Sequence, residues 1–182
     1  MHAHVFAEDS NTTADDPDLP LAEYYQGLFS IVAGLADDLS ELADTHLHVL
    51  SEDFGVGEET QSYAELTGER GSSSGREEMT EAGRETLLET APDADVMVVL
   101  LSTDVFDATV GDHWDELVEA AKPGSVWCLS AARSSLDALP VADLEAKGCT
   151  VITYQRVGVA RIGSDTREQL LETVQQNSHS QS

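Results

Sequence analysis

The apolar run at residues 94–102, ADVMVVLLS, constrains the fold more than any other feature of the sequence. A strand with one face in water would alternate apolar and polar residues, and a helix would need a longer periodic pattern, so this run predicts a strand buried on both faces. The residues at its end, Ser102, Thr103 and Asp104, are polar. Open α/β sheets bind ligands at the carboxyl ends of such strands. The run therefore predicts a parallel sheet with a ligand site at one edge.

The other apolar residues alternate between helical and strand-like spacing. Residues 21–42 carry apolar side chains every three or four positions, which predicts an amphipathic helix, and residues 45–50 alternate as a strand does. Further helices are expected at 77–90, 112–121, 134–147 with an interruption at Pro140, and 164–174, and further strands at 125–130, 149–154 and 157–162. This order predicts a three-layer Rossmann-like α/β fold with a mostly parallel, doubly wound sheet.

The length of 182 residues fits one domain, and we assign residues 21–175 to a single Rossmann-like α/β domain. A short strand is one alternative for residues 2–8. Residues 9–20, however, are rich in Asp, Asn, Thr and Pro and show no periodicity. We therefore expect residues 1–20 to form a flexible amino-terminal arm. The polar residues 176–182 are expected to form a disordered tail.

The charge of the chain is strongly unbalanced. Thirty-five acidic residues and nine basic ones give a formal net charge of −26, and the carboxylates are spread along the whole chain. At ordinary ionic strength so many carboxylates repel one another in a compact fold, whereas salt near 1 M screens this repulsion within about 3 Å. We therefore expect a halophilic protein from an archaeal, haloarchaeal-type cytosol. A nucleic-acid partner is disfavoured but not excluded, because phosphate binding needs clustered Lys and Arg.

Cysteine usage and hydropathy bear on the compartment. Cys128 and Cys149 lack metal-ligand spacing such as C-x-x-C, so structural thiols are expected. No run approaches the roughly 18 apolar residues of a membrane span, and the amino terminus lacks a signal-peptide pattern. These features predict a soluble, cytoplasmic protein without a membrane partner, and they leave a homodimer open.

Polar side chains follow four of the expected strands. Because the carboxyl ends of parallel strands meet at one edge of a sheet, we expect these side chains to gather there. The candidate ligand-binding residues are Asp53, Ser102, Thr103, Asp104, Asp107, Ser130, Arg133 and Arg156. Arg133 and Arg156 are two of only seven arginines, and a guanidinium suits a carboxylate or a phosphate. The alternatives are that the strand ends are merely solvated and that the arginines form salt bridges.

Two histidine pairs, His2 with His4 and His46 with His48, have the i, i+2 spacing that places both rings on the same face of a strand. Imidazole pairs suit borderline metals, and Asp53 or Asp104 is available to complete a site. No third ligand is fixed by spacing, so a divalent metal is one cofactor hypothesis and the cofactor stays unassigned. No phosphate loop, dinucleotide fingerprint, nucleophile elbow or H-E-x-x-H motif occurs, so catalytic residues also stay unassigned.

The segment at residues 90–136, TAPDADVMVVLLSTDVFDATVGDHWDELVEAAKPGSVWCLSAARSSL, resembles the Rossmann-like family of heavy-metal chelation domains. In that family an Ala-Asp-Val strand runs into a Thr/Ser-rich end, an Asn-Gly-Thr-like turn, a helix and a strand ending in Gly-Pro-Ser. The comparable positions here are Asp95, Ser102, Thr103, Asp107, Thr109 and Ser130. Ala108 replaces the glycine of the turn, and Ser-Ala-Ala at 130–132 replaces Gly-Pro-Ser. The resemblance implies a Rossmann-like fold with a ligand near these residues.

A second resemblance covers the first half of the chain. The segments YYQGLFSIVAGLADDL, HVLSEDFGV and SYAELTG are similar to a domain of archaeosine-synthase-type RNA modification proteins, in which a strand ending Leu-Ser precedes a glycine and a Tyr-x-x-x-Thr-Gly turn follows. This similarity implies a role in nucleotide or nucleic-acid modification.

The function predicted from the sequence is binding of a small anionic or metal-bearing ligand at the carboxyl ends of the strands. Oxygen donors such as those of Ser102, Thr103 and Asp104 favour a hard cation or a hydrogen-bonded carboxylate. One alternative is a nucleotide- or RNA/DNA-modification enzyme that uses Asp53 or Asp104 as a base. The other is a non-catalytic interaction protein.

Overall fold

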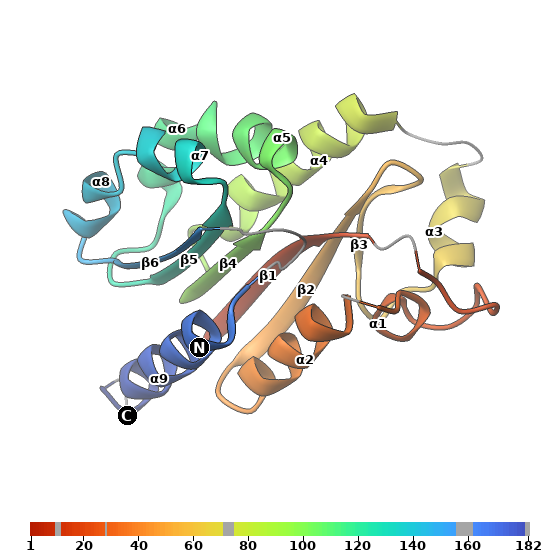
Figure 1. Cartoon of the computed structure of the whole chain (residues 1–182), viewed down its shortest axis with the longest axis horizontal. Helices are drawn as coiled ribbons and strands as arrows, with labels where there is room; N and C mark the ends of the chain where they lie inside the picture. The colour runs from red at the N-terminus through yellow and green to blue at the C-terminus, as the bar shows by residue number, and fades with distance from the viewer. Residues whose placement is uncertain (10–11, 28, 71–74, 156–161, 181–182) are drawn as a thin grey trace.

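The computed structural model describes residues 1–9, 12–27, 29–70, 75–155 and 162–180. Its centre is a six-stranded sheet with the order β3-β2-β1-β4-β5-β6 (Figure 1). The strands are β1 (His2–Glu8), β2 (Asp44–Ser51), β3 (Gly55–Glu58), β4 (Val96–Leu100), β5 (Val126–Ala131) and β6 (Thr150–Gln155). Five of them are parallel, and β3 pairs antiparallel with β2 at one edge. The predicted α/β class with a mostly parallel sheet is confirmed.

Helices cover both faces of this sheet, as a doubly wound topology requires. The helices α2 (Phe29–Ser40) and α9 (Ser164–Ser180) lie on one face. The other face carries α4 (Gly75–Thr90), α5 (Thr103–Phe106), a π-helical turn (Asp107–Gly111), α6 (Trp114–Ala120), α7 (Arg133–Ala138) and α8 (Ala142–Glu145). Two short helices, α1 (Leu21–Tyr24) and α3 (Tyr63–Arg70), lie beside the end of the sheet near β3 (Figure 1).

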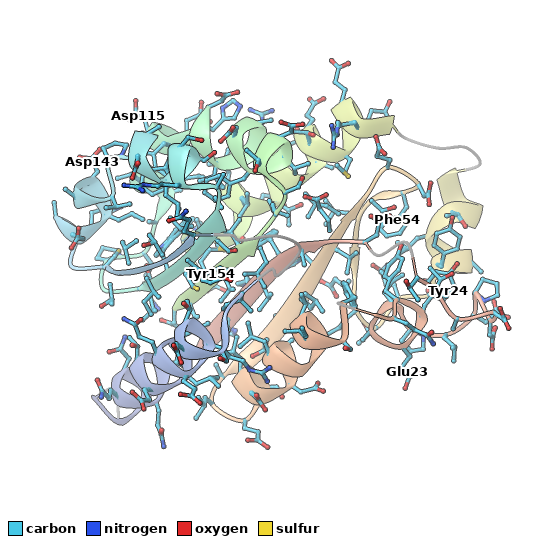
Figure 2. All side chains as sticks on the ribbon, viewed as in Figure 1. Glu23, Tyr24, Phe54, Asp115, Asp143 and Tyr154 are labelled. Carbon is cyan, nitrogen blue, oxygen red and sulfur yellow. The ribbon has the colours of Figure 1, made fainter. Side chains whose placement is uncertain are left out.

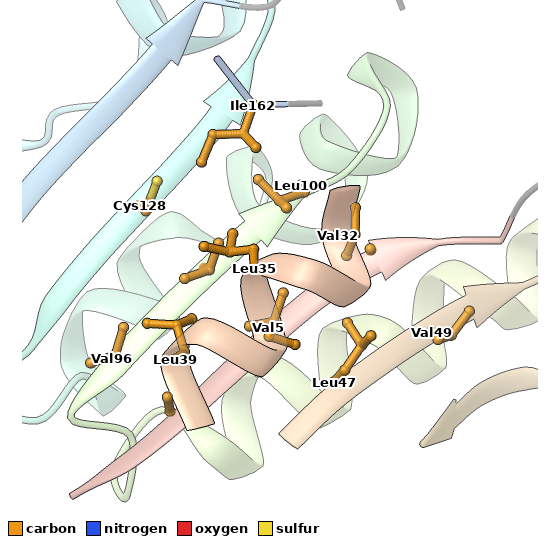
Figure 3. Close-up of a cluster of buried hydrophobic side chains, with 14 of the residues drawn as sticks. Val5, Val32, Leu35, Leu39, Leu47, Val49, Val96, Leu100, Cys128 and Ile162 are labelled. Atoms are coloured by element: carbon orange, nitrogen blue, oxygen red, sulfur yellow. The ribbon is translucent and has the colours of Figure 1, made fainter. Parts of the chain in front are cut away.

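Each face of the sheet has its own apolar core. Under α2, Val5, Leu47 and Val98 of the sheet belong to one buried cluster with Val32 and Leu35, and Figure 3 shows several members of this cluster. Under α4 to α8, the core contains Phe6 and Trp127. All five residues of β4 are buried, so the apolar run that predicts a central strand does form one.

The expected flexible arm at residues 1–20 is wrong for its first part. Residues His2–Glu8 form β1, which lies between β2 and β4 in the middle of the sheet. Val5 packs under α2 while Phe6 packs under α4, and both are fully buried. The strand is short and its apolar residues are flanked by histidines, so its burial on both faces is not visible in the local pattern.

Two other expectations require correction, and one is confirmed. The helix expected at 21–42 is divided into α1 and α2, because Tyr25 is extended (ψ 131°) and Gly27 has a left-handed backbone (φ 67°), and a helix continues through neither conformation. The tail expected at 176–182 is helical as far as Ser180.

The expected interruption at Pro140 is confirmed, since α7 ends before it and α8 begins after it. The strand expected at 157–162 falls almost wholly outside the described residues.

Within the described part of the chain, no helix is both long enough and apolar enough to cross a membrane.

Candidate functional site

The carboxyl ends of β1 and β4 lie side by side where the strand order of the sheet reverses. The backbone N–H of Ser102, just after β4, donates to Oε1 of Glu8 at the end of β1 over 2.5 Å. From β1 the chain winds to β2 on one side, whereas β4 to β6 lie on the other side. Such a junction is where open α/β sheets form their ligand crevice.

A network of hydroxyl and carboxylate groups extends from this junction across the end of β2. The hydroxyl of Ser51 donates to Asp9 (2.8 Å) and accepts from the backbone N–H of Asp53 (3.1 Å). The phenol of Tyr63 in turn donates to Oδ2 of Asp53 (2.9 Å). We call Glu8, Asp9, Tyr25, Ser51, Asp53, Tyr63 and Ser102 the carboxyl-edge cluster.

Two hydroxyls of the carboxyl-edge cluster are buried and have no hydrogen-bond partner among the described residues: Tyr25 Oη and Ser102 Oγ. Tyr25 is only 3% exposed, and the Ser51 hydroxyl beside its phenol acts to lower its pKa, but the contact does not reach full hydrogen-bond geometry. Burial and the nearby Asp9 carboxylate raise the pKa of Tyr25. Buried polar atoms in native proteins almost always have a partner, so each of these hydroxyls needs an explanation.

Aromatic rings close the outer side of the cluster. The ring of Tyr63 stacks on Tyr24 with centroids 5.0 Å apart and meets Phe54 edge-on at 6.2 Å. Tyr24 and Phe54 lie near α1 and α3 in Figure 2. Burial, together with the hydrogen bond to Asp53, raises the pKa of Tyr63 to about 12. Both tyrosines of the cluster, Tyr25 and Tyr63, therefore keep their phenolic protons at neutral pH.

The sequence-predicted ligand residues that the structure describes have different surroundings. Asp53 and Ser102 belong to the carboxyl-edge cluster, and Ser130 is fully buried at the end of β5. Asp104 is exposed and lies 3.6 Å from Arg76 of α4, where both line a cavity of about 530 Å³. Asp107 lines another cavity, of about 320 Å³, beside α7.

The two remaining predicted residues that the structure describes, Thr103 and Arg133, are exposed. Thr103 is exposed at the start of α5. Arg133 is 76% exposed and lies 3.6 Å from Asp137 one turn further along α7, which is the salt bridge that we considered as an alternative. Arg156 lies outside the described residues.

A separate groove of about 790 Å³, which we call the histidine groove, lies between α4 and the β1–β2–β3 side of the sheet. Its lining includes His4, His46, His48, Glu58, Glu85 and Glu89. Nδ1 of His4 is 2.9 Å from Nε2 of His48, and the His4 ring stacks on both His46 and His48. Burial, and then the neighbouring His4, lowers the pKa of His48 to about 3, while burial and His46 lower the pKa of His4. Both rings are therefore uncharged at neutral pH.

As the i, i+2 spacing predicts, His46 and His48 lie on the same face of β2, and the structure adds His4 of β1 beside them, whereas the two carboxylates that were available to complete a site do not join them. Asp53 lies in the carboxyl-edge cluster and Asp104 on α5, so neither lines the histidine groove. In the parts of the chain that the structure describes, no three His, Cys, Asp or Glu side chains are arranged to hold a metal ion. Cys128 and Cys149 are buried free thiols, and burial raises the pKa of Cys128 to about 12.

Sequence reasoning missed Glu8, Asp9 and Tyr25. The first two follow directly from the position of β1, since a strand at residues 2–8 places their carboxylates at its carboxyl end. Tyr25 gave no signal, because its spacing fits the apolar face of the expected helix. Its burial beside Ser51 depends on the break at Gly27 that separates α1 from α2.

No protein-family model matches the chain, and no significant match exists among curated proteins. A solved structure of a diflavin flavoprotein A3 from Nostoc sp. is similar over 98% of this chain and 93% of that chain, with 8% identity and a TM-score of 0.43. An azoreductase from Bacillus anthracis is similar over 99% and 98%, with 13% identity and a TM-score of 0.36.

Proposed function

We propose that this chain is a small-molecule-binding α/β domain whose ligand lies over the carboxyl ends of β1 and β4 and hydrogen-bonds to Ser102 and Tyr25. The observation that carries the proposal is the pair of buried hydroxyls without a partner among the described residues. Leaving such a group unsatisfied costs about 1–3 kcal/mol. A ligand that accepts from or donates to both hydroxyls would recover that energy, at the position where sheets of this topology bind ligands.

The charge of the site selects among ligands. Glu8, Asp9 and Asp53 are all acidic, and each accepts a hydrogen bond or contacts a neighbour within the protein. A bare anion would approach these carboxylates against their repulsion. The ligand that we propose is therefore a small polar molecule that carries a bound divalent cation or a cationic group of its own. Of the two ligand types predicted from the sequence, anionic and metal-bearing, this proposal favours the metal-bearing one.

The proposal is tested by thermal unfolding in molar potassium chloride against FMN, NAD, AMP and S-adenosylmethionine, each with and without magnesium. FMN belongs in this panel because the order of the parallel strands corresponds to that of flavodoxin-like sheets, an analogy of fold alone. A ligand at a hundredfold its dissociation constant should stabilise the protein by about 2.7 kcal/mol.

Variants decide where any ligand binds. The stabilisation should disappear in Ser102→Ala and in Tyr25→Phe. It should persist in Ser40→Ala, which removes a hydroxyl from the end of α2. Ligand stabilisation that survives both cluster variants would refute the proposed position, and a panel without any effect would favour the interaction-protein alternative.

The nucleic-acid-modification alternative stays a prediction with its own test. It requires Asp53 or Asp104 as a base, and in the structure Asp53 accepts from Tyr63 while Asp104 lies near Arg76. RNA that co-purifies with the protein in molar salt, and that is lost in Asp53→Asn, would favour it over the small-molecule proposal.

A further inference from the structure

Four of the six histidines in the chain lie on β1 and β2, on the face that α4 covers. In the register of these strands His2 is opposite Asp44, His4 is opposite His46, and Phe6 is opposite His48. Because alternate residues of a strand share a face, the rings form one continuous stack, with centroids 4.7–5.4 Å apart from His46 through His4 and His48 to Phe6. The stack lines the histidine groove and lies at the opposite half of β1 from the carboxyl-edge cluster.

One contact within the stack brings two imidazole nitrogens together. Nδ1 of His4 and Nε2 of His48 are 2.9 Å apart, and the residues are only 8% and 6% exposed. Two imidazole nitrogens bound to one tetrahedral ion at about 2.0–2.1 Å are separated by about 3.3 Å. The two nitrogens are therefore closer than two ligands of one such ion, and binding requires the rings to turn apart. In the metal-free protein the same two nitrogens share one N–H, which satisfies both.

We propose that His4 Nδ1 and His48 Nε2 bind one divalent transition-metal ion, of the zinc, nickel and copper class, at the floor of the histidine groove. Imidazole nitrogen is a ligand of these borderline metals, whereas calcium and magnesium prefer oxygen. The groove gives the ion a path to solvent. Since no third ligand of the His, Cys, Asp or Glu type converges on this point among the described residues, water occupies the other coordination positions.

The surroundings of the pair favour a cation. Glu58, Glu85 and Glu89 line the groove, and Glu85 and Glu89 stand one turn apart near the carboxyl end of α4. The carboxyl end of a helix carries a partial negative charge that attracts cations. These carboxylates supply charge and hydrogen bonds to metal-bound water, and the two histidines supply the bonds to the ion.

This site is independent of the proposed small-molecule site. The ion lies under α4 at the amino-terminal half of β1, whereas Ser102 and Tyr25 lie at the carboxyl edge. Failure of either proposal leaves the other unchanged, because the two tests use different probes and different variants.

The experiment is calorimetric titration of the full, chelator-treated chain in molar potassium chloride with zinc and nickel salts, and with calcium as the hard-cation control. We expect one equivalent of zinc or nickel and no heat from calcium. His4→Gln and His48→Gln should each weaken binding by at least about tenfold, because each removes one of two protein ligands. The matched control, His113→Gln, changes a histidine at the start of α6 and should bind as the unchanged protein does.

Other outcomes overturn the proposal. Absence of zinc and nickel binding does so, as does binding that survives both His4→Gln and His48→Gln. Loss of binding only in His46→Gln would place the ion near Asp44, whose carboxylate is 3.7 Å from His46, and would equally contradict the assignment.

A second measurement does not depend on the folding of the variants. The electron paramagnetic resonance spectrum of copper bound to the unchanged chain reports the number of coordinating imidazoles. Two nitrogens support the His4–His48 pair, and any other number contradicts it.

Discussion

At the scale of single residues, the unpartnered hydroxyl of Tyr25 makes a prediction about stability without a ligand. Tyr25→Phe removes a buried group that has no hydrogen bond to lose among the described residues, so it should leave the free energy of unfolding unchanged or raise it by about 1 kcal/mol. Tyr63→Phe is the matched control, because it removes the 2.9 Å hydrogen bond to Asp53 and should destabilise the fold by about 1 kcal/mol. Urea unfolding in molar salt measures both. An equal loss in the two variants would show that Tyr25 has a partner in the folded protein.

A second residue-scale prediction concerns pH and the buried end of β4. Asp95 is 8% exposed and accepts from Lys122 Nζ (2.5 Å) and from the backbone N–H of His2 (2.8 Å). Burial acts to raise the pKa of Asp95, but these hydrogen bonds and the charge of Lys122 outweigh it and lower the pKa. A carboxylate with a depressed pKa contributes stability at pH values above its unfolded pKa of about 3.9, and this contribution is lost as the pH falls further.

The test compares the unchanged protein with Asp95→Asn. At pH 6 the variant should be less stable by about 1–3 kcal/mol, since it loses a charge-assisted hydrogen bond from Lys122. The difference should shrink as the pH is lowered below 4. Subtracting the two unfolding curves removes the contribution of the other carboxylates, and a difference that is constant down to pH 2 would contradict the role given to Asp95.

At the scale of elements, the packing of α4 on β2 predicts opposite effects for the same substitution at two helical glycines. A Cβ at Gly83 of α4 would lie 2.5 Å from Leu50 Cδ2, so Gly83→Ala should destabilise the protein by about 1–3 kcal/mol. A Cβ at Gly34 of α2 meets nothing closer than 3.6 Å, from Arg167. Gly34→Ala should therefore stabilise the protein by up to about 1 kcal/mol through helix propensity. Thermal unfolding of both variants checks the packing, and stabilisation by Gly83→Ala would show that α4 is not seated against Leu50.

At the scale of the whole molecule, the net charge of −26 predicts a strong dependence of stability on salt. The Debye length falls from about 10 Å at 0.1 M to about 3 Å at 1 M, which removes most of the repulsion between surface carboxylates. The midpoint of thermal unfolding should rise steadily from 0.1 M to 2 M potassium chloride. The same midpoint across this range would show that the acidic surface is not an adaptation to salt.

Sequence and structure contributed differently at each scale. The sequence alone determined the α/β class, because buried strands and amphipathic helices leave local periodic patterns that need no knowledge of distant partners. It also placed Ser102 at the end of a central strand, and His46 and His48 on the same face of another.

Only the tertiary structure decided which residues meet. The place of β1 between β2 and β4 brings Glu8 to Ser102 across 94 positions and His4 to His48 across 44. It also gives different neighbours to three carboxylates that the sequence had predicted to share one site: Asp53 accepts from Tyr63, whereas Asp104 and Asp107 line two other cavities. The physical reason is that strand order is fixed by burying both faces of the whole sheet, a sum over many distant contacts that no local pattern contains.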